Sequence, residues 1–153
     1  TIPTANSQPS GIVAGPSTNL WFTESNADKV GRVTSGGTFT EFALPAGANP
    51  ADIALGPDGN FYATEPGIGH IARVTTSGTV TQADLSGLSG GATPQSITAG
   101  PDQHLWFTDP AGDRIGRLST GGLVTEFPLP AGADPAAAEP PGPFAIPSPG
   151  MPP

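Results

Sequence analysis

Apolar residues along this chain form short runs that Gly, Pro, Asn and Asp residues separate. Near the start of the sequence these runs are rich in Val, Ile, Phe, Trp and Thr, which favour strands, and they cover residues 12–14, 20–23, 30–34 and 39–44. The intervening glycines and prolines supply the backbone geometry of tight turns. Sustained helical periodicity is not found, so we expect almost no helix. The pattern predicts an all-β protein built from short antiparallel strands.

The same order of runs recurs along the sequence. One block, which begins with proline and ends with a carboxylate residue, is found at residues 9–24, 50–65 and 94–109. Spacings of 41, 44 and 41 residues separate the prolines that open successive copies, which are Pro9, Pro50, Pro94 and Pro135. Four antiparallel strands in about 42 residues is the size of one β-propeller blade, whereas leucine-rich and hexapeptide solenoid repeats are shorter. The sequence therefore predicts three four-stranded antiparallel propeller blades.

The copies divide the chain into segments of blade size. We assign residues 9–49 to blade 1, residues 50–93 to blade 2 and residues 94–134 to blade 3. Residues 1–8 match the end of a preceding blade, and residues 135–153 form a Pro-rich tail that we expect to be extended or disordered. Three blades do not close a ring, since propellers use roughly four to eight. We therefore expect a partial propeller that is either a fragment of a longer one or is completed by self-association through its blade ends.

Composition narrows the partners of the protein. The formal net charge is -8, with 13 acidic against 5 basic residues, which argues against binding to nucleic acid or to anionic membrane surfaces, since both need clustered Lys and Arg. No run of about 20 apolar residues is present to span a bilayer. The chain has no cysteine, hence no disulfide framework or thiolate metal site. Acidity, few lysines and many Thr, Ser and Gly residues are typical of a secreted bacterial protein, so we expect an extracellular or cell-surface location.

Four blocks of the repeat carry a family resemblance. They are L-W-F-T-E at residues 20–24, K-V-G-R-V-T at 29–34, T-E-F-A-L-P at 40–45 and G-P-D-G-N at 56–60. In this order and spacing, from residue 1 to about residue 135, the chain resembles the virginiamycin B lyase (streptogramin lyase) family. The resemblance implies a β-propeller. In family members that are enzymes it also implies opening of streptogramin B rings by elimination at the ester linkage, with a histidine base and Mg²⁺ as Lewis acid.

The positions that carry the family's chemistry are only partly matched. The family's essential histidines follow the proline that opens certain repeats, but here those positions hold Ser10, Ala51, Gln95 and Ala136. A family metal carboxylate precedes one such proline, and here the residues before the prolines are Gln8, Asn49, Thr93 and Asp134. Acids that end the second strand do match, and these candidate metal ligands are Glu24, Glu65 and Asp109. We therefore expect no catalytic residue, and Mg²⁺ only as the resemblance implies.

Each recurring residue also has a structural interpretation. The three acids would cap turns or pair with a basic residue of their blade, and recurring arginines would stack on aromatics or pair with these acids: Arg32, Arg73 and Arg117. The recurring aromatics are interpreted as interblade core, with a sugar-stacking platform as the alternative: Trp21, Tyr62, Trp106, Phe22 and Phe107. We interpret His70 as a solvated polar site, His104 as a turn residue, and Asp58 and Asp102 as ordinary turn chemistry.

Three functions remain open at this point. The first is a non-catalytic, secreted propeller module that acts as a structural or interaction unit. The second is an enzyme like virginiamycin B lyase, or a fragment of one, which would be a Mg²⁺-dependent carbon–oxygen lyase. The third is a glycan-binding propeller, which the recurring aromatics and acids suggest. A small-molecule or glycan ligand and a second copy of the chain are the partners that these functions imply.

Overall fold

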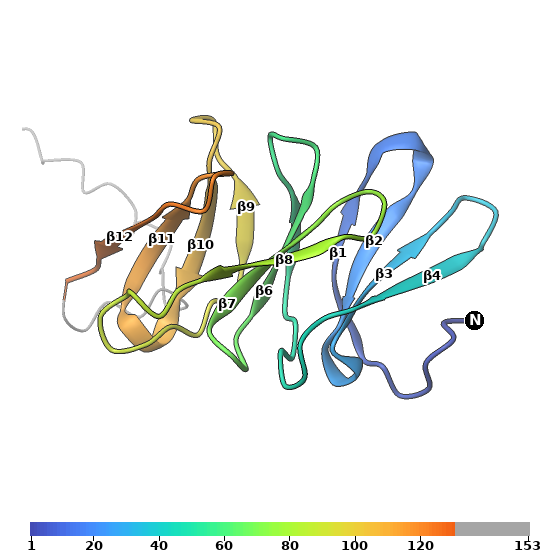
Figure 1. The fold of residues 1–153 in the computed structure, drawn as a ribbon, viewed down its shortest axis with the longest axis horizontal. Coiled ribbons are helices and arrows are strands. Elements are labelled where there is room, and N and C mark those ends of the chain that lie inside the picture. The colour runs from blue at the N-terminus through green and yellow to red at the C-terminus, as the bar shows by residue number, and fades with distance from the viewer. Residues whose placement is uncertain (131–153) are drawn as a thin grey trace, which may run out of the picture.

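The computed structural model describes residues 1–130 and contains three four-stranded antiparallel sheets, as the sequence predicts (Figure 1). Each sheet is one blade, and its strands are hydrogen-bonded in sequence order. Blade 1 contains β1 (Pro9–Ala14), β2 (Leu20–Glu24), β3 (Lys29–Val33) and β4 (Phe39–Ala43). Blade 2 contains β5 (Ile53–Leu55), β6 (Phe61–Glu65), β7 (His70–Val74) and β8 (Val80–Asp84). Blade 3 contains β9 (Ile97–Ala99), β10 (Leu105–Asp109), β11 (Arg114–Leu118) and β12 (Val124–Pro128).

Helix is confined to short 3₁₀ turns in the described part of the chain, at Pro16–Thr18, Ser25–Ala27 and Pro110–Gly112. None of these has the length or apolar character of a membrane-spanning helix. The predicted Pro-rich tail at residues 135–153 lies outside the described residues, as do the last residues assigned to blade 3.

The strands follow the predicted runs closely, because each run ends at a residue that favours a turn. β3 and β4 pair in register from Lys29 with Ala43 to Val33 with Phe39, and the connecting turn contains Gly37 at a φ of +82°. Gly78 and Gly122 occupy the same place in the other two blades and also have positive φ, a conformation that side chains with a Cβ rarely adopt. β1 begins at Pro9, earlier than predicted, and its pairing with β2 is irregular between Pro9 and Ile12.

The blades lie side by side (Figure 1), and the first strand of each blade contacts the first strand of the next, β1 with β5 and β5 with β9. The apolar core lies between blades, because each sheet is apolar on both faces. Between blades 1 and 2 the ring of Trp21 stacks on Phe61 at 4.1 Å between centroids and on Phe42 at 5.3 Å. Tyr62 lies in the corresponding cluster between blades 2 and 3. The burial of Trp21 and Tyr62 confirms the interpretation of these aromatics as core.

The second interface is less completely filled than the first. Ala83 stands in blade 2 where Phe42 stands in blade 1, and it lines a cavity of about 210 Å³ together with Tyr62, Arg73 and residues 118–122 of blade 3. The cavity lies where the larger ring of a phenylalanine would reach toward the next blade. The small side chain of Ala83 therefore leaves unfilled the space that the ring of Phe42 fills at the interface of blades 1 and 2.

One recurring threonine hydrogen-bonds each blade to the next. The hydroxyl of Thr23 donates to the carbonyl oxygen of Ala51 at 3.3 Å, and the hydroxyl of Thr64 donates to the carbonyl oxygen of Gln95 at 2.7 Å. The amide of Gly11 also donates to the oxygen of Ala51, so the start of the first strand in one blade is bonded to the start of the next. These bonds hold the residues that follow Pro50 and Pro94 at the blade junctions.

Candidate functional site

The three acids predicted as metal ligands occupy equivalent places in different blades. Glu24 ends β2, Glu65 ends β6 and Asp109 ends β10, and all three side chains are fully buried. The sheet register places each acid opposite the first residue of the following strand, which gives the pairs Glu24 with Lys29, Glu65 with His70, and Asp109 with Arg114. The acids of different blades therefore have different partners, and each must be considered separately.

Asp109 forms a satisfied ion pair. Arg114 is buried beside it and donates from Nε to Oδ2 of Asp109 at 2.8 Å, while its Nη1 donates to Oε2 of Glu126 at 2.6 Å. The other carboxylate oxygen of Asp109 accepts the backbone amide of Thr93 at 2.9 Å. This geometry confirms, for blade 3, the expectation that the acid pairs with a basic residue of its own blade. Buried pairs of this kind are structural, because removing either partner leaves an uncompensated charge.

Glu24 is buried without such a partner. The ammonium group of Lys29 binds Glu41 instead, and Glu41 also accepts the amide of Thr4 at 2.9 Å and its hydroxyl at 2.8 Å. Neither carboxylate oxygen of Glu24 accepts a hydrogen bond of good geometry. Burial, followed by the charge of Glu41, raises the pKa of Glu24, and the nearby Ser7 hydroxyl and Lys29 ammonium offset part of that rise.

Glu65 is the most strongly perturbed acid. Gln82 donates from Nε2 to Oε1 of Glu65 at 3.3 Å, and Oε2 has no hydrogen-bond partner. Blade 2 has His70 and Gln82 where blade 3 has Arg114 and Glu126, so Glu65 has no counterpart of the buried arginine, and its hydrogen bond comes from the neutral amide of Gln82. Burial raises the pKa of Glu65 to about 7, which the hydrogen bond from Gln82 opposes and the charge of Asp28 reinforces. Glu65 thus titrates near neutral pH.

A polar groove of about 390 Å³ is lined by residues that directly follow Glu65 and by the segment that leads from blade 2 to blade 3. Its walls are residues 66–69, which follow β6, and residues 91–93, with His70, Asp84 and Ser86 along the side of blade 2. Nε2 of His70 lies 3.5 Å from Oδ1 of Asp84, so the histidine interpreted as a solvated polar site also has an acidic partner. The amide and hydroxyl of Ser86 and the charge of His70 hold the pKa of Asp84 below its usual value. The groove could receive a small polar group.

Two of the positions that follow the opening prolines, Ala51 and Gln95, have a structural use here. The carbonyl groups of Ala51 and Gln95 accept the interblade threonine bonds, while Ser10 and Gln95 have exposed side chains. His104 is a turn residue as predicted, and its Nδ1 lies 2.7 Å from the carbonyl oxygen of Asp102. Ala136 and Asp134 lie outside the described residues.

Two of the recurring arginines stack on aromatic rings, which is one of the two structural interpretations given for them. Arg32 stacks over Trp21, with its Cζ at 5.6 Å from the ring centroid, and Arg117 stacks over Trp106 at 5.7 Å. Arg32 and Arg117 stand directly opposite Trp21 and Trp106 in the sheet register, three residues away from the strand-two acids, so stacking is the alternative that the structure shows for these two arginines.

The turn acids Asp58 and Asp102 do more than the sequence predicted. Arg73 binds Asp58 at 3.1 Å, and Arg117 lies 3.7 Å from Asp102. Asp58 also accepts the hydroxyl of Tyr62 at 3.0 Å, and Asp102 accepts the indole N–H of Trp106 at 2.9 Å. The four-residue spacing between acid and aromatic is the sequence signal that was available for this contact.

The arrangement does not converge on a metal. No group of three His, Cys, Asp or Glu side chains within residues 1–130 is placed to hold an ion. Glu24, Glu65 and Asp109 lie in three separate sheets, and Asp109 already binds a cation in Arg114. Mg²⁺ requires several oxygen ligands around one point, so the described acids do not fit the Mg²⁺ site that the family resemblance implies.

Comparison with known proteins shows which family has this sequence and architecture. The sequence model of the virginiamycin B lyase family matches residues 1–142. Virginiamycin B lyase from Staphylococcus aureus is 39% identical with a TM-score of 0.82, and the match covers 86% of this chain and 45% of that protein. A catalytically inactive histidine-to-alanine variant of that lyase, crystallised with quinupristin, is 40% identical with a TM-score of 0.81, covering 85% and 44% of the two chains.

A streptogramin B lyase structure is 37% identical with a TM-score of 0.82, covering 86% of this chain and 44% of the other. No match was found among the curated proteins. The chain thus spans less than half the length of the solved lyases that it resembles, and its three sheets correspond to propeller blades of those enzymes. On the extent of the family match and the identity to these structures, the chain belongs to the virginiamycin B lyase family.

Proposed function

We propose that this chain is a non-catalytic β-propeller module, which acts as a structural or interaction unit. The observation that carries the proposal is the chemistry after the opening prolines, where the family resemblance places the essential histidines. Ser10, Ala51 and Gln95 stand there, and none of these side chains exchanges a proton near neutral pH. The backbone at Ala51 and Gln95 is bonded across the blade junctions, so these positions serve the assembly of blades.

The state of the acids supports the same proposal. Asp109 is neutralised by Arg114, and Glu24 and Glu65 are enclosed in separate blades. Elimination assisted by a metal needs carboxylate oxygens that meet at one accessible point beside the base. The described acids do not provide that geometry. We further propose an extracellular or cell-surface location, which the low lysine content and the acidic charge favour.

The test uses quinupristin, the compound found with the inactive Staphylococcus aureus variant. Elimination opens the ring without adding water, so the product is detected by a chromatographic shift at unchanged mass. We expect no shift when the purified chain is incubated with quinupristin and Mg²⁺, while the Staphylococcus aureus lyase serves as the positive control. Turnover by this chain that chelation of Mg²⁺ abolishes would overturn the proposal.

The alternative is that the chain is part of a lyase whose active site other blades complete. Identities of 37–40% to solved lyases, over less than half their length, favour this alternative. Mixing the chain with the part of the Staphylococcus aureus lyase that it does not match tests it directly. Quinupristin turnover by the mixture, with none by either part, would support the alternative.

The glycan-binding alternative has less support. Trp21 and Tyr62 are buried between blades and offer no free face to a sugar ring, which leaves Trp106 as the partly exposed member of the set. Binding of an oligosaccharide that a Trp106→Ala substitution abolishes would be needed to support this function.

A further inference from the structure

The outer face of blade 1 exposes apolar residues at positions that are buried in blade 2. Ile12 on β1 is 63% exposed and Leu20 on β2 is 43% exposed. Their counterparts in blade 2 are Ile53 and Phe61, which are 3% and 0% exposed because blade 1 covers them. An apolar hollow of about 250 Å³ lies on this face, and its lining includes Ile12, Phe22 and Phe39. We call this surface the front face.

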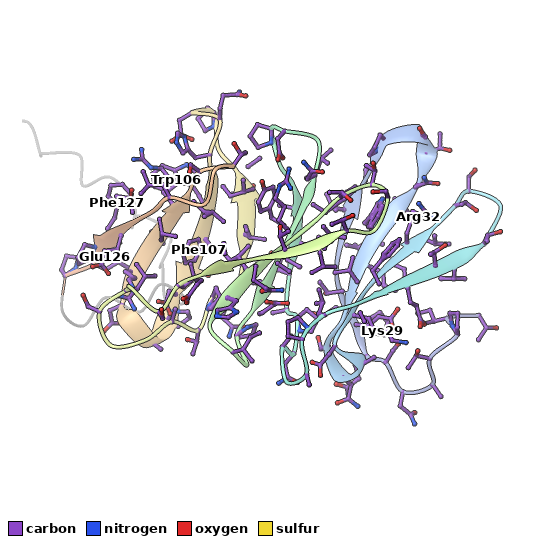
Figure 2. All side chains as sticks on the ribbon, viewed as in Figure 1. Lys29, Arg32, Trp106, Phe107, Glu126 and Phe127 are labelled. Atoms are coloured by element: carbon purple, nitrogen blue, oxygen red, sulfur yellow. The ribbon has the colours of Figure 1, made fainter. Side chains whose placement is uncertain are left out.

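The outer face of blade 3 is the complementary surface. Trp106, Ile115 and Phe127 occupy the positions of Trp21, Val30 and Phe42, which in blade 1 pack against blade 2. Phe127 is 40% exposed, and an apolar hollow of about 270 Å³ is lined by Trp106 and Ile115 among others. Figure 2 shows Trp106 and Phe127 together at the end of the molecule that lies opposite Lys29 and Arg32. We call this surface the back face.

The junction of blades 1 and 2 shows how such faces pack, because there the side of blade 1 that is equivalent to the back face contacts the side of blade 2 that is equivalent to the front face. Phe61 stacks on Trp21 at 4.1 Å, and Nη1 of Arg32 donates to the carbonyl oxygen of Thr76 at 3.4 Å. The turn at Gly78 packs so closely on Phe42 that an added Cβ would lie 2.2 Å from its ring. Each of these contacts joins one residue of blade 1 to one residue of blade 2.

The two open faces carry counterparts for every one of these contacts. On the back face, Trp106 replaces Trp21, Arg117 replaces Arg32 and Phe127 replaces Phe42. On the front face the counterparts of Phe61, Thr76 and Gly78 are Leu20, Ser35 and Gly37. A Cβ built at Gly37 meets no atom within 4 Å, whereas Gly78 is covered by Phe42, so the place that a phenylalanine ring fills between blades 1 and 2 is free on blade 1.

We infer that the front face of one copy of this chain packs on the back face of a second copy, with Leu20 against Trp106 and Phe127 over Gly37. Arg117 then donates to the carbonyl oxygen of Ser35, as Arg32 does to Thr76. The contact joins unlike faces, so it is head-to-tail and extends into a closed ring or a filament. This inference goes beyond the proposed function, since it holds whether or not the chain catalyses a reaction.

Two single-face variants of the 153-residue chain test the inference. Leu20→Asp blocks the front face and Phe127→Asp blocks the back face, and both residues are exposed, so the fold should tolerate the substitutions. Sedimentation velocity should show concentration-dependent assembly of the wild-type chain. Each variant alone should self-associate with an affinity at least about tenfold lower than that of the wild type. An equimolar mixture should form a one-to-one dimer that does not grow, because it contains one free front face and one free back face that meet only once.

The control is Leu123→Asp, an exposed apolar residue that lines neither hollow and whose substitution should leave assembly unchanged. Circular dichroism checks that each variant retains its strands. A wild-type chain that stays a folded monomer at all concentrations overturns the inference and assigns the faces to another occupant, such as further blades. Self-association of either variant alone indicates contact between like faces, which also overturns it, as does a mixture that yields no dimer.

Discussion

Replacing Glu65 by glutamine should stabilise the protein at alkaline pH, because Glu65 is a buried carboxyl group with no cation beside it. Its side chain is fully enclosed, and one oxygen accepts only the amide of Gln82. The Glu65→Gln variant keeps an acceptor for that amide and cannot ionise. Its advantage over the wild type should therefore follow the ionisation of Glu65.

The magnitude follows from the pKa of Glu65, which burial raises from the ordinary 4.5 to about 7. A carboxyl whose pKa is higher in the folded protein than in the unfolded chain favours folding below the unfolded value. That contribution is lost as the pH rises through the folded value. At about 1.4 kcal/mol per pKa unit, ionisation of the buried group costs on the order of 3 kcal/mol at pH 8 and less than about 1 kcal/mol at pH 5.

Urea unfolding followed by tryptophan fluorescence measures this difference at pH 5, 6, 7 and 8. The stability of Glu65→Gln relative to the wild type should rise by roughly 2 kcal/mol between pH 5 and pH 8. Glu41→Gln is the matched control with the opposite sign. Burial acts to raise the pKa of Glu41, but hydrogen bonds from Lys29 and Thr4 outweigh it and lower that pKa. The loss of stability in Glu41→Gln should therefore be present at neutral pH and shrink as the pH falls through the lowered pKa.

A relative stability of Glu65→Gln that does not change with pH would refute this reasoning, since it would mean that Glu65 ionises as freely in the folded protein as in the unfolded chain. A Glu65→Gln variant that is destabilised relative to the wild type by more at pH 8 than at pH 5 would refute the reasoning as well, because this result would require a cation beside the carboxylate of Glu65.

Three further predictions concern packing and the buried ion pair, and urea unfolding at pH 7 measures each. Arg114→Met should lower the free energy of unfolding by about 3–5 kcal/mol, because it leaves Asp109 buried without its cation; a loss below about 1 kcal/mol would contradict this. Trp21→Ala should cost about 3–5 kcal/mol and Trp106→Ala clearly less in the monomer, since Trp21 is stacked between blades. Ala83→Phe should stabilise by about 1 kcal/mol by filling the cavity that Ala83 lines, and a loss would mean that the ring does not fit.

The blade architecture could be predicted from the sequence because its determinants are local. Runs such as residues 20–24 combine β-branched and aromatic residues, and Gly-containing turns such as the one at Gly37 separate them, so strand positions follow from short stretches of sequence. The recurring aromatics could likewise be placed between blades from strand alternation. The early start of β1 at Pro9 was missed, because its pairing is irregular and no apolar run marks it.

The partners of the buried acids could not be predicted in the same way. Glu24, Glu65 and Asp109 occupy one repeat position, yet their surroundings depend on which residues stand across the sheet in each blade. Lys29 and Glu41 stand where Arg114 and Glu126 stand in blade 3, but Arg114 binds both acids of its blade, whereas Lys29 binds Glu41 and not Glu24. Thr4 also bonds to Glu41, and this contact comes from a segment that the repeat does not include.

Each described blade is a contiguous stretch of sequence, with strands that pair in the order in which they occur. A ribosome releases such a blade completely before the next one begins, so β1–β4 can pair while β5–β12 are still being synthesised. Neighbouring-strand pairing keeps loop closure short and folding fast, and domains generally fold as units during synthesis. The strand order therefore favours a chain that folds one blade at a time as it emerges, with each finished blade offering its apolar face as the template on which the next blade is laid.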